Sequence, residues 1–375
     1  MGSAMELTGS SAESDRMLLD ARSLTLVVSG VLAVVLVSLV SMLPVPYALM
    51  SPGPIRDVLS GTGEHQLIQI EGHQTYPTDG SLDLLTVQVS GGPGAGASVW
   101  QLLGAWADPT VEARPIAEVY PPDVTAEEVE QENTAEMVSS QEAATAAALT
   151  ELGIDVTYRL EVGAIQDDVP AAQALQPGDT IRSVDGRPVV SLTELADQLT
   201  AMPAGQQVEV EIDRDGQTST VRFATSSVTE DDGSTRTVLG ITPASRYSFP
   251  FDVQIRIDDI GGPSAGMIFA LGIVDKLTPG AMTGGSRVAG TGTMSADGRV
   301  GAIGGIRQKM YAAVDEGGVN YFLAPADNCV DVAGHVPAGL QVISVSTLSQ
   351  ARDAVETIGR GDAQAISALP ACAAN

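Results

Sequence analysis

Lysine is almost absent from this chain of 375 residues. Among its 19 lysines and arginines, only Lys276 and Lys309 are lysines. Arginine stays protonated in proteins and therefore does not serve as a base. Any reaction that needs a neutral side-chain amine must use one of these two residues.

Histidine and cysteine are also scarce. The three histidines, His65, His73 and His335, and the two cysteines, Cys329 and Cys372, do not have the spacing of metal ligands. No histidine lies in a motif typical of a Ser-His-Asp protease. We expect no metal and no other cofactor. The cysteines could form a disulfide in an oxidising compartment or remain free thiols, and the sequence leaves both alternatives open.

A phosphate-binding loop and an excess of basic charge are missing as well. The glycine-rich segment 91–98 is not followed by lysine, and the sequence contains no Gly-Lys dipeptide. A nucleotide-binding loop of the GxxxxGK[ST] type is therefore not visible, and we expect no nucleotide partner. The formal net charge of −28 disfavours nucleic acid and anionic lipid as partners. The acidic residues also fit the ordinary role of solvating the surface.

The longest apolar run extends from Leu24 to Leu43 and carries no charge. As a helix it is about 30 Å long, which matches the hydrocarbon core of a bilayer. A buried core helix is rarely so uniformly apolar, and a cleaved signal peptide has a shorter apolar core, so we expect a retained anchor. Arg16 and Arg22 precede the run, and the next basic residue is Arg56. The positive-inside rule then predicts a single-pass cell-membrane protein with a cytoplasmic N-terminus and an extracytoplasmic bulk.

The next part of the chain combines short strands with a long helix. Segments 66–72 and 82–90 predict strands separated by glycine, aspartate and serine turns. Residues 125–152 are rich in alanine, glutamate and glutamine and predict a helix, with Thr125 and Glu128 at the spacing of a capping box. We expect this helix to serve packing or linkage rather than chemistry.

Residues 157–227 form a distinct unit. It contains two strands around a tight Asp185-Gly186 turn, a helix, and a hairpin at Asp215-Gly216. Its most specific residues are Pro170, Ala171, Ala172, Leu175, Pro177, Gly178, Asp179, Ile181, Val184, Asp185, Gly186 and Val189. Together they resemble a bacterial PDZ domain. The resemblance implies a small β-rich fold that binds an extended peptide by adding a strand beside its own edge.

The unit departs from the PDZ pattern at Asp167 and Asp168. The PDZ family usually has a more apolar strand with glycine in this region. Two acids near a carboxylate-binding loop disfavour the free C-terminus of a ligand because like charges repel. We therefore expect internal or basic segments as ligands.

Ser264 lies between a strand predicted at 251–257 and an apolar helix predicted at 264–276. Free backbone N–H groups at a helix start can stabilise an oxyanion, which would suit a nucleophile at this position. Serine is also a very common N-cap residue, so the position alone favours that plain structural role. The candidate oxyanion donors are the backbone groups of Gly262, Pro263 and Ala265.

Lys309 lies in the first turn of a helix predicted to begin near Arg307. The helix dipole opposes a cation there and lowers the pKa of the lysine, and burial would lower that pKa further. A neutral Lys309 could act as the general base for Ser264. The alternative is a surface lysine whose stem lies along apolar side chains.

Three motifs around these residues read Pro263-Ser264-Ala265-Gly266, Thr291-Gly292 and Gly304-Gly305-Ile306-Arg307-Gln308-Lys309. They resemble the proteolytic domain of the Lon family, most closely its membrane-anchored, PDZ-containing branch without an ATPase domain. The resemblance is strongest over residues 245–350. It implies a catalytic dyad of Ser264 and Lys309, with the Thr291 hydroxyl orienting the lysine amine.

One position departs from the Lon pattern. ATP-dependent Lon enzymes carry aspartate three residues before the serine, where this chain has Gly261. The supporting role of that aspartate is then either absent or supplied by Asp258 or Asp259.

The sequence predicts an α+β protein with an N-terminal transmembrane helix and a small β-rich PDZ domain placed before an α/β Lon-type proteolytic domain. The predicted segments are a cytoplasmic tail (1–23), the transmembrane helix (24–43), a β-rich and helical connecting region (44–156), the PDZ-like domain (157–227), the proteolytic domain (244–360) and a C-terminal tail (361–375).

The predicted function is that of an ATP-independent serine endopeptidase that degrades or processes extracytoplasmic or membrane-associated proteins. The resemblance to the Lon family also implies polypeptide substrates and a homo-oligomer, commonly a hexameric ring. The alternative function is a catalytically silent PDZ scaffold that binds peptides at the membrane. A β-lactamase-like enzyme is disfavoured because Ile273 and Ile306, rather than serines, lie three residues before the two lysines.

Overall fold

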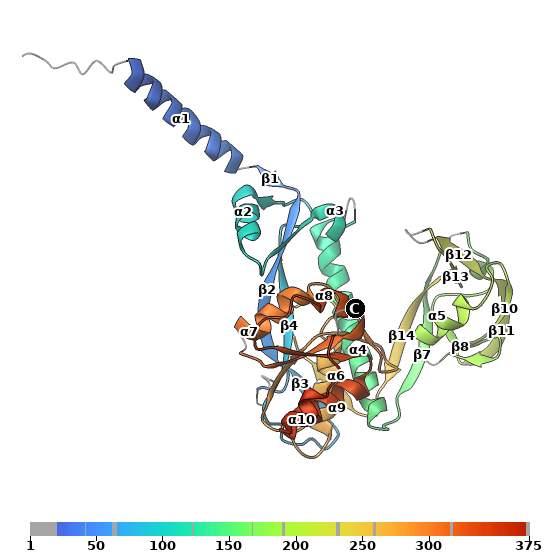
Figure 1. The fold of residues 1–375 in the computed structure, drawn as a ribbon. Coiled ribbons are helices and arrows are strands. Elements are labelled where there is room, and N and C mark those ends of the chain that lie inside the picture. The colour runs from blue at the N-terminus through green and yellow to red at the C-terminus, as the bar shows by residue number, and fades with distance from the viewer. Residues whose placement is uncertain are drawn as a thin grey trace, which may run out of the picture.

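The computed structural model describes residues 21–41, 43–61, 66–121, 124–166, 168–189, 192–229, 233–257, 260–315 and 318–372. It shows a projecting N-terminal helix, a body built on a mixed sheet, and a β-rich lobe beside the body (Figure 1). The predicted tail up to residue 20 lies outside the described residues, as do His65, Asp167, Asp258 and Asp259.

The N-terminal helix α1 (Ala21–Ser41) extends away from the rest of the chain (Figure 1). Its segment Leu24–Ser41 has a mean hydropathy of 2.6, and none of it is buried in the molecule. Its length and composition suit a membrane-spanning helix, and an N-terminal signal sequence shares both features. The apolar helix predicted at 24–43 is therefore present as far as Ser41, and its role as a retained anchor stays a prediction.

The body is built around a six-stranded mixed sheet with the strand order β20-β19-β16-β4-β2-β6. The first four strands in this order run parallel, whereas β2 is antiparallel to both β4 and β6. These strands are β2 (Tyr47–Asp57), β4 (Ser81–Ser90), β6 (Glu112–Pro115), β16 (Arg287–Gly290), β19 (Tyr321–Pro325) and β20 (Gln341–Val345). The strand predicted at 82–90 is therefore confirmed as β4.

Three small strand pairs complete the body. They are β1 (Pro44–Val45) with β5 (Ala97–Ser98), β3 (Ile68–Glu71) with β15 (Asp252–Ile255), and β17 (Thr293–Met294) with β18 (Val300–Gly301). The strands predicted at 66–72 and 251–257 correspond to β3 and β15, which pair with each other.

Helices cover both faces of the main sheet because its central strands are apolar on both sides. Neighbouring residues point to opposite faces, so Leu84 packs with one buried cluster and Leu85 with the other. Helices α4, α6 and α9 pack on the Leu84 side, and α7 packs on the Leu85 side. The helices of the body are α2 (Val99–Ala107), α3 (Ile116–Val119), α4 (Ala126–Glu151), α6 (Gly266–Leu277), α7 (Ile306–Asp315), α8 (Cys329–Val332), α9 (Leu348–Gly359) and α10 (Ala363–Ser367).

The long helix α4 begins as its sequence predicts. Thr125 is the N-cap, and Thr125 and Glu128 form the reciprocal hydrogen bonds of a capping box. Its buried side includes Ala144, Ala147 and Ala148, whose small side chains let the helix lie close to α6. The position of α4 against α6 matters for the candidate site described below.

The main sheet crosses a predicted boundary. Strands β2, β4 and β6 come from the region predicted as a connection (44–156), yet they share one sheet with strands from the region 244–360. Strand β4 is the link, because it pairs with β2 on one side and β16 on the other. Its first half, from Ser81 to Leu85, is buried and needs neighbours on both edges. The main sheet therefore begins at Tyr47, and the β-rich lobe is inserted between its strands.

The β-rich lobe is a second sheet with the order β11-β10-β8-β7-β14, and β9 pairs with β8. The predicted hairpin is confirmed, because Asp215 and Gly216 have positive φ angles of 52° and 78° and join β10 to β11. The elements of the lobe are β7 (Thr157–Ile165), a 3-10 turn (Pro170–Gln173), β8 (Thr180–Val184), β9 (Arg187–Pro188), α5 (Leu192–Thr200), β10 (Gln207–Arg214), β11 (Gln217–Ala224), β12 (Ser226–Thr229), β13 (Thr235–Val238) and β14 (Ile241–Ser248).

The lobe extends beyond the boundary predicted at residue 227. Strand β14 pairs with β7 along its whole length, from Ile241 opposite Ile165 to Ser248 opposite Thr157. It is the last strand in the sheet order, so its outer edge has no strand partner among the described residues. The sequence of β14, ITPASRYS, lacks a clear apolar alternation, which explains why the pattern did not predict it.

Cys329 and Cys372 form a disulfide that joins α8 to the C-terminal segment. The same segment lies along β20, because the Ser344 N–H donates to the Pro370 carbonyl at 2.8 Å. Of the two alternatives that the sequence left open, the structure has the disulfide. Such a bond is typical of proteins in oxidising compartments.

Reduction of this disulfide should lower the stability of the body. The cysteines are 43 residues apart in the sequence, and closing a loop of that length stabilises a fold by about 4 kcal/mol in the chain-entropy estimate. We expect Cys372→Ser to lower the free energy of unfolding by about 2–4 kcal/mol. Denaturant unfolding measures this loss, and dithiothreitol should shift the midpoint of the wild type but not of the variant. An unchanged wild-type midpoint in reductant would contradict the prediction.

Candidate active site

Three side chains from separate elements meet in the body. Lys309 Nζ lies 2.8 Å from Ser264 Oγ and 2.9 Å from Thr291 Oγ1. Ser264 lies just before α6, Thr291 directly follows β16, and Lys309 lies in the first turn of α7. The structure thus brings together the three side chains that the sequence motifs single out.

Ser264 does not cap the helix that follows it. Helix α6 begins at Gly266, and Ala265 occupies the N-cap position without a side-chain hydrogen bond. The Ser264 side chain faces Lys309 instead, while its carbonyl accepts hydrogen bonds from the Thr291 hydroxyl at 3.0 Å and from the Gly292 N–H at 2.9 Å. The helix therefore starts two residues later than predicted, and the plain N-cap role of this serine is not realised.

Lys309 is buried, with only 2% of its surface exposed. Because burial penalises the charged ammonium group, it lowers the pKa of Lys309 from 10.5 to about 7. The alternative of an exposed lysine with a snorkelling side chain is therefore wrong. Near neutral pH a large fraction of these amines carries no charge, and the lone pair of the neutral amine can accept the proton of the Ser264 hydroxyl.

A cavity of about 480 Å³ opens onto Ser264 and Lys309. Strands β2 and β4 form part of its wall through Pro54 and residues 86–88, and Gly261 and Gly304 line it as well. At Gly305, a Cβ atom would lie 2.6 Å from Val87 Cγ2, and φ is 68°. Glycine is needed there for the turn that directs α7 and its lysine toward the cavity.

Helix α4 holds the loop before Ser264 in place. Ser140 Oγ donates to the Pro263 carbonyl at 2.9 Å, and the Gly262 N–H donates to the Asn133 carbonyl at 3.0 Å. A side chain at Gly261 would meet Asn133 Cβ at 2.7 Å. Helix α4 therefore leaves little room for an aspartate at the position where ATP-dependent Lon enzymes have one.

Sequence reasoning missed these contacts of α4. Asn133 acts through its backbone carbonyl, so its side-chain type carries no signal. Ser140 is one of several small polar residues in an alanine-rich helix, and only its burial on the side facing Pro263 distinguishes it.

The predicted oxyanion donors need correction. The Gly262 N–H already donates to Asn133, and Pro263 has no N–H group. Within the part of the chain that the structure describes, the N–H groups of Ser264 and Ala265 donate to no protein acceptor. Because these two groups lie just before the first turn of α6, they are the ones available to an oxyanion near Ser264.

Comparison with known proteins assigns two regions of the chain. Residues 137–225 match the PDZ domain family, and residues 258–356 match the Lon protease (S16) C-terminal proteolytic domain. The second match includes Ser264, Thr291 and Lys309. Neither matching family is an ATPase domain.

Individual proteins are also similar to parts of the chain. A Lon protease of Azospirillum brasilense is 42% identical over 90 residues, which are 23% of this chain and 11% of the relative. A probable periplasmic serine endoprotease DegP-like of Pseudomonas fluorescens is 39% identical over 72 residues, which are 19% of this chain and 15% of the relative. The chain thus spans only about a tenth to a seventh of the length of these relatives. The crystal structure of the PDZ domain of the SdrC-like protein from Listeria monocytogenes is 26% identical, with a TM-score of 0.21 over 22% of this chain and 85% of that chain.

Residues 258–356 are thus similar to the proteolytic domain of Lon proteases, and the relatives named above are proteases. More specifically, the chain combines a PDZ domain with a Lon-type C-terminal proteolytic domain, and it carries an apolar N-terminal helix.

Burial of the Lys309 amine should reduce the stability of the fold. The folded-state pKa of about 7 lies below the unfolded value of 10.5, so the unfolded chain binds more protons between these two pH values. The cost is therefore complete at and below pH 7 and disappears as the pH rises toward 10.5. We expect Lys309→Met to raise the free energy of unfolding at pH 7 by about 2–5 kcal/mol.

Denaturant unfolding of wild type and Lys309→Met at pH 7 and pH 9.5 measures this effect. The difference between the two proteins should shrink at the higher pH, because the wild type gains stability there. A difference that stays constant with pH would show that the amine is not held at a lowered pKa.

Proposed function

We propose that this chain is an ATP-independent serine endopeptidase in which Ser264 is the nucleophile and Lys309 is the general base. The observation that carries the proposal is the buried amine of Lys309, whose pKa of about 7 and distance of 2.8 Å from Ser264 Oγ suit proton transfer. The absence of a GxxxxGK[ST] motif from the sequence supports a reaction without nucleotide.

The reaction proceeds in two steps. The neutral Lys309 amine removes the hydroxyl proton as Ser264 Oγ attacks the carbonyl carbon of a peptide bond, and the N–H groups of Ser264 and Ala265 stabilise the oxyanion. The ammonium group then gives its proton to the leaving amine, so that an acyl-enzyme remains. Water attacks the acyl-enzyme in the second step, with Lys309 again as base, and releases the acid and free Ser264.

Thr291 positions the amine in this mechanism. Its hydroxyl donates to the Ser264 carbonyl at 3.0 Å, so the oxygen lone pairs are directed toward Lys309 Nζ at 2.9 Å. With one of its protons held by Thr291, the lysine amine can direct its lone pair to Ser264 Oγ. Thr291 is 1% exposed and therefore has little freedom to leave this arrangement.

The body is proposed to work outside the cytoplasm, anchored by α1. Three observations support this location: the length and apolar character of α1, Arg16 and Arg22 before the apolar run that begins at Leu24, and the disulfide between Cys329 and Cys372. Relatives named as periplasmic serine endoproteases fit the same location.

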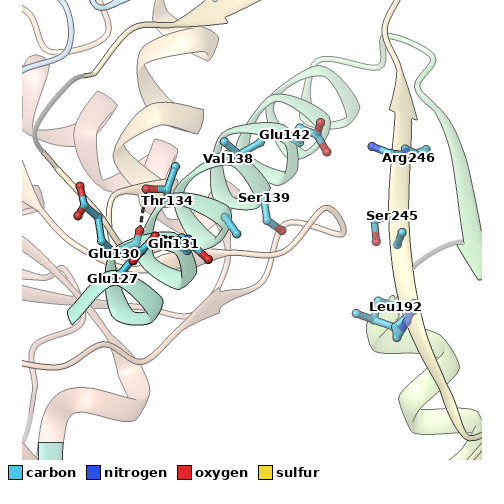
Figure 2. Close-up of a pocket in the computed structure, with 13 residues that line it drawn as sticks. Glu127, Glu130, Gln131, Thr134, Val138, Ser139, Glu142, Leu192, Ser245 and Arg246 are labelled. Carbon is cyan, nitrogen blue, oxygen red and sulfur yellow. Dashed lines mark hydrogen bonds between the residues drawn. The ribbon is translucent and has the colours of Figure 1, made fainter. Parts of the chain in front are cut away.

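Substrate is proposed to dock as an extended strand along β14. A cavity of about 950 Å³ separates β14 from α4, and Figure 2 shows side chains of α4 on one side and Ser245, Arg246 and Leu192 on the other. The outer edge of β14 offers backbone groups for a further strand. Because α4 also holds the loop before Ser264, the docked strand would lie beside the helix that supports the nucleophile.

The charge of this groove favours basic segments. Glu127, Glu130 and Glu142 line it on α4. Among the described residues that line the groove, Arg246 is the basic one, and it lies 3.4 Å from Glu161. A polypeptide with lysine or arginine side chains would offset this negative charge. The charge of the groove therefore favours basic polypeptide segments as ligands. Asp167 and Asp168 lead to the same expectation from the sequence.

Assembly into a homo-oligomer, with a hexamer as the expected form, remains a prediction from the resemblance to the Lon family.

Single substitutions test the dyad. We expect Ser264→Ala to abolish cleavage of an unfolded protein such as casein in the absence of ATP, and Lys309→Met to lower kcat by at least about 10²–10⁴-fold. In the wild type, kcat/KM should rise from pH 6 to pH 8 with a midpoint near 7, because only the neutral amine accepts the proton.

Lys276 provides the matched control. It is the other lysine of the chain, it is also buried, and its pKa is lowered by burial, yet it lies in the last turn of α6. Lys276→Met should retain cleavage. Labelling by a fluorophosphonate that requires Ser264 would exclude the silent PDZ scaffold, whereas unimpaired cleavage by Lys309→Met would refute the dyad.

Neutralising the groove should weaken the binding of basic substrates. In the triple variant Glu127→Gln, Glu130→Gln, Glu142→Gln, we expect KM for a lysine-rich unfolded polypeptide to rise about 3–10-fold with kcat unchanged, because each exposed ion pair contributes about 0.2–1 kcal/mol. A short peptide that reaches only the Ser264 cavity serves as control and should be cleaved as by the wild type. Equal effects on both substrates would contradict docking in the groove.

A further inference from the structure

The short helix α2 presents an unusual apolar face to solvent. Both tryptophans of the chain lie on it, and Trp100 and Trp106 are 54% and 70% exposed. Leu103, between them, is 44% exposed. The three residues recur every three positions and therefore share one side of the helix. The helix sequence, VWQLLGAWA, contains no charged residue.

The opposite side of α2 is fixed to the body. Leu102 and Ala105 are buried and pack with Leu49 of β2 and Ala97 of β5. At the start of the helix, Ser98 and Gln101 form a complete capping box. The exposed tryptophan face is thus held in one orientation by the packing behind it, so it is a built surface of the fold.

This face lies directly at the end of α1. Trp100 Nε1 donates to Ser41 Oγ, at the last residue of α1, at 2.6 Å. The pairing of β1 with β5 joins the chain that leaves α1 to the residues that precede α2. Figure 1 shows α2 beside β1 at the base of the projecting helix. If α1 crosses a bilayer, α2 lies at the level where the chain leaves the hydrocarbon core.

We propose that the face formed by Trp100, Leu103 and Trp106 lies in the interfacial layer of the bilayer that α1 crosses. This inference rests on the anchoring part of the proposed function. Tryptophan favours this layer because its ring is apolar and its N–H group can hydrogen-bond at the headgroup level. A helix with one apolar face and a packed opposite face lies in the plane of such an interface.

The charged residues near α2 indicate which kind of lipid headgroup this face would meet. The acidic residues Asp108, Glu112 and Glu118 follow the helix, and Arg114 is within 4 Å of both glutamates. The side of the body around α2 therefore offers little attraction to anionic headgroups. The partner is a zwitterionic lipid surface, and binding depends on apolar burial rather than on charge.

Intrinsic fluorescence tests the proposal, because α2 holds every tryptophan of the chain. The full-length protein is reconstituted into phosphatidylcholine vesicles, with and without phosphatidylcholine brominated near the headgroup end of its acyl chains. We expect the brominated lipid to quench the tryptophan emission at least twofold. Acrylamide in the aqueous phase should quench the tryptophan emission several-fold less than it does in the unfolded chain. Adding phosphatidylglycerol to the vesicles should change neither the quenching by bromine nor the quenching by acrylamide.

A single tryptophan on the far side of the body serves as control. In the background Trp100→Phe, Trp106→Phe, the substitution Gln364→Trp adds an exposed ring on α10, which lies at the opposite end of the body from α1 (Figure 1). This ring should be open to acrylamide and insensitive to brominated lipid.

Three results would overturn the proposal, and they differ from one another. In the first, acrylamide quenches Trp100 and Trp106 as strongly as the control tryptophan, although the protein resists carbonate extraction. This result would show that the chain is anchored but that α2 does not lie in the lipid. Protection from acrylamide without quenching by brominated lipid would assign the face to a second copy or another protein. In the third, carbonate extracts the protein from the vesicles, which would refute both the anchoring by α1 and the interfacial position of α2. Casein cleavage in detergent would then still test the proposed peptidase activity separately.

Discussion

The burial of one lysine amine beside a serine hydroxyl is the constraint on which the rest of the structure depends. Lys309 has its lowered pKa because it is buried, with Ser264 from the loop before α6 and Thr291 after β16 at hydrogen-bond distance. Helices α6 and α7 pack on opposite faces of one sheet, and β16 is one of its central strands. Strand β4 joins the two parts of that sheet across the inserted lobe. The mixed sheet is therefore the frame that holds three distant segments at hydrogen-bond distance.

Helix α4 couples the PDZ lobe to this frame. It ends just before β7, its side lines the groove opposite β14, and Ser140 and the Asn133 carbonyl hold the loop before the serine. Strand β14 leads back through β15 toward that same loop. Helix α4 thus connects to the lobe at its C-terminal end and contacts the loop before Ser264 through Asn133 and Ser140. Under the proposed docking, a strand along β14 would lie beside this helix.

Sequence reasoning succeeds where the chemistry resides in side chains. Ser264 and Lys309 could be singled out because their residue types and helix-start positions carry the signal, and the scarcity of lysine narrowed the choice of base. Thr291 was identified only through the Thr-Gly motif of the Lon family. It failed where backbone groups do the work, as at Asn133 and the predicted oxyanion donor Gly262. It also missed β14 and the early start of the catalytic sheet at Tyr47, because strand partners that are distant in sequence leave no local pattern.

Strand β2 has a consequence for the geometry of proteolysis. Its first residues follow α1 by only a few positions, and Pro54, near its other end, lines the cavity over Ser264. The chain from Ser41 to Pro54 can span at most about 45 Å when fully extended. With α1 in a bilayer, this strand acts as a rigid tether that keeps the cavity within that height. If the chain is the membrane-anchored peptidase proposed above, it would cut a membrane-bound substrate near the membrane surface, so that only a short segment stays attached to the membrane. A folded domain held farther from the membrane would be out of reach.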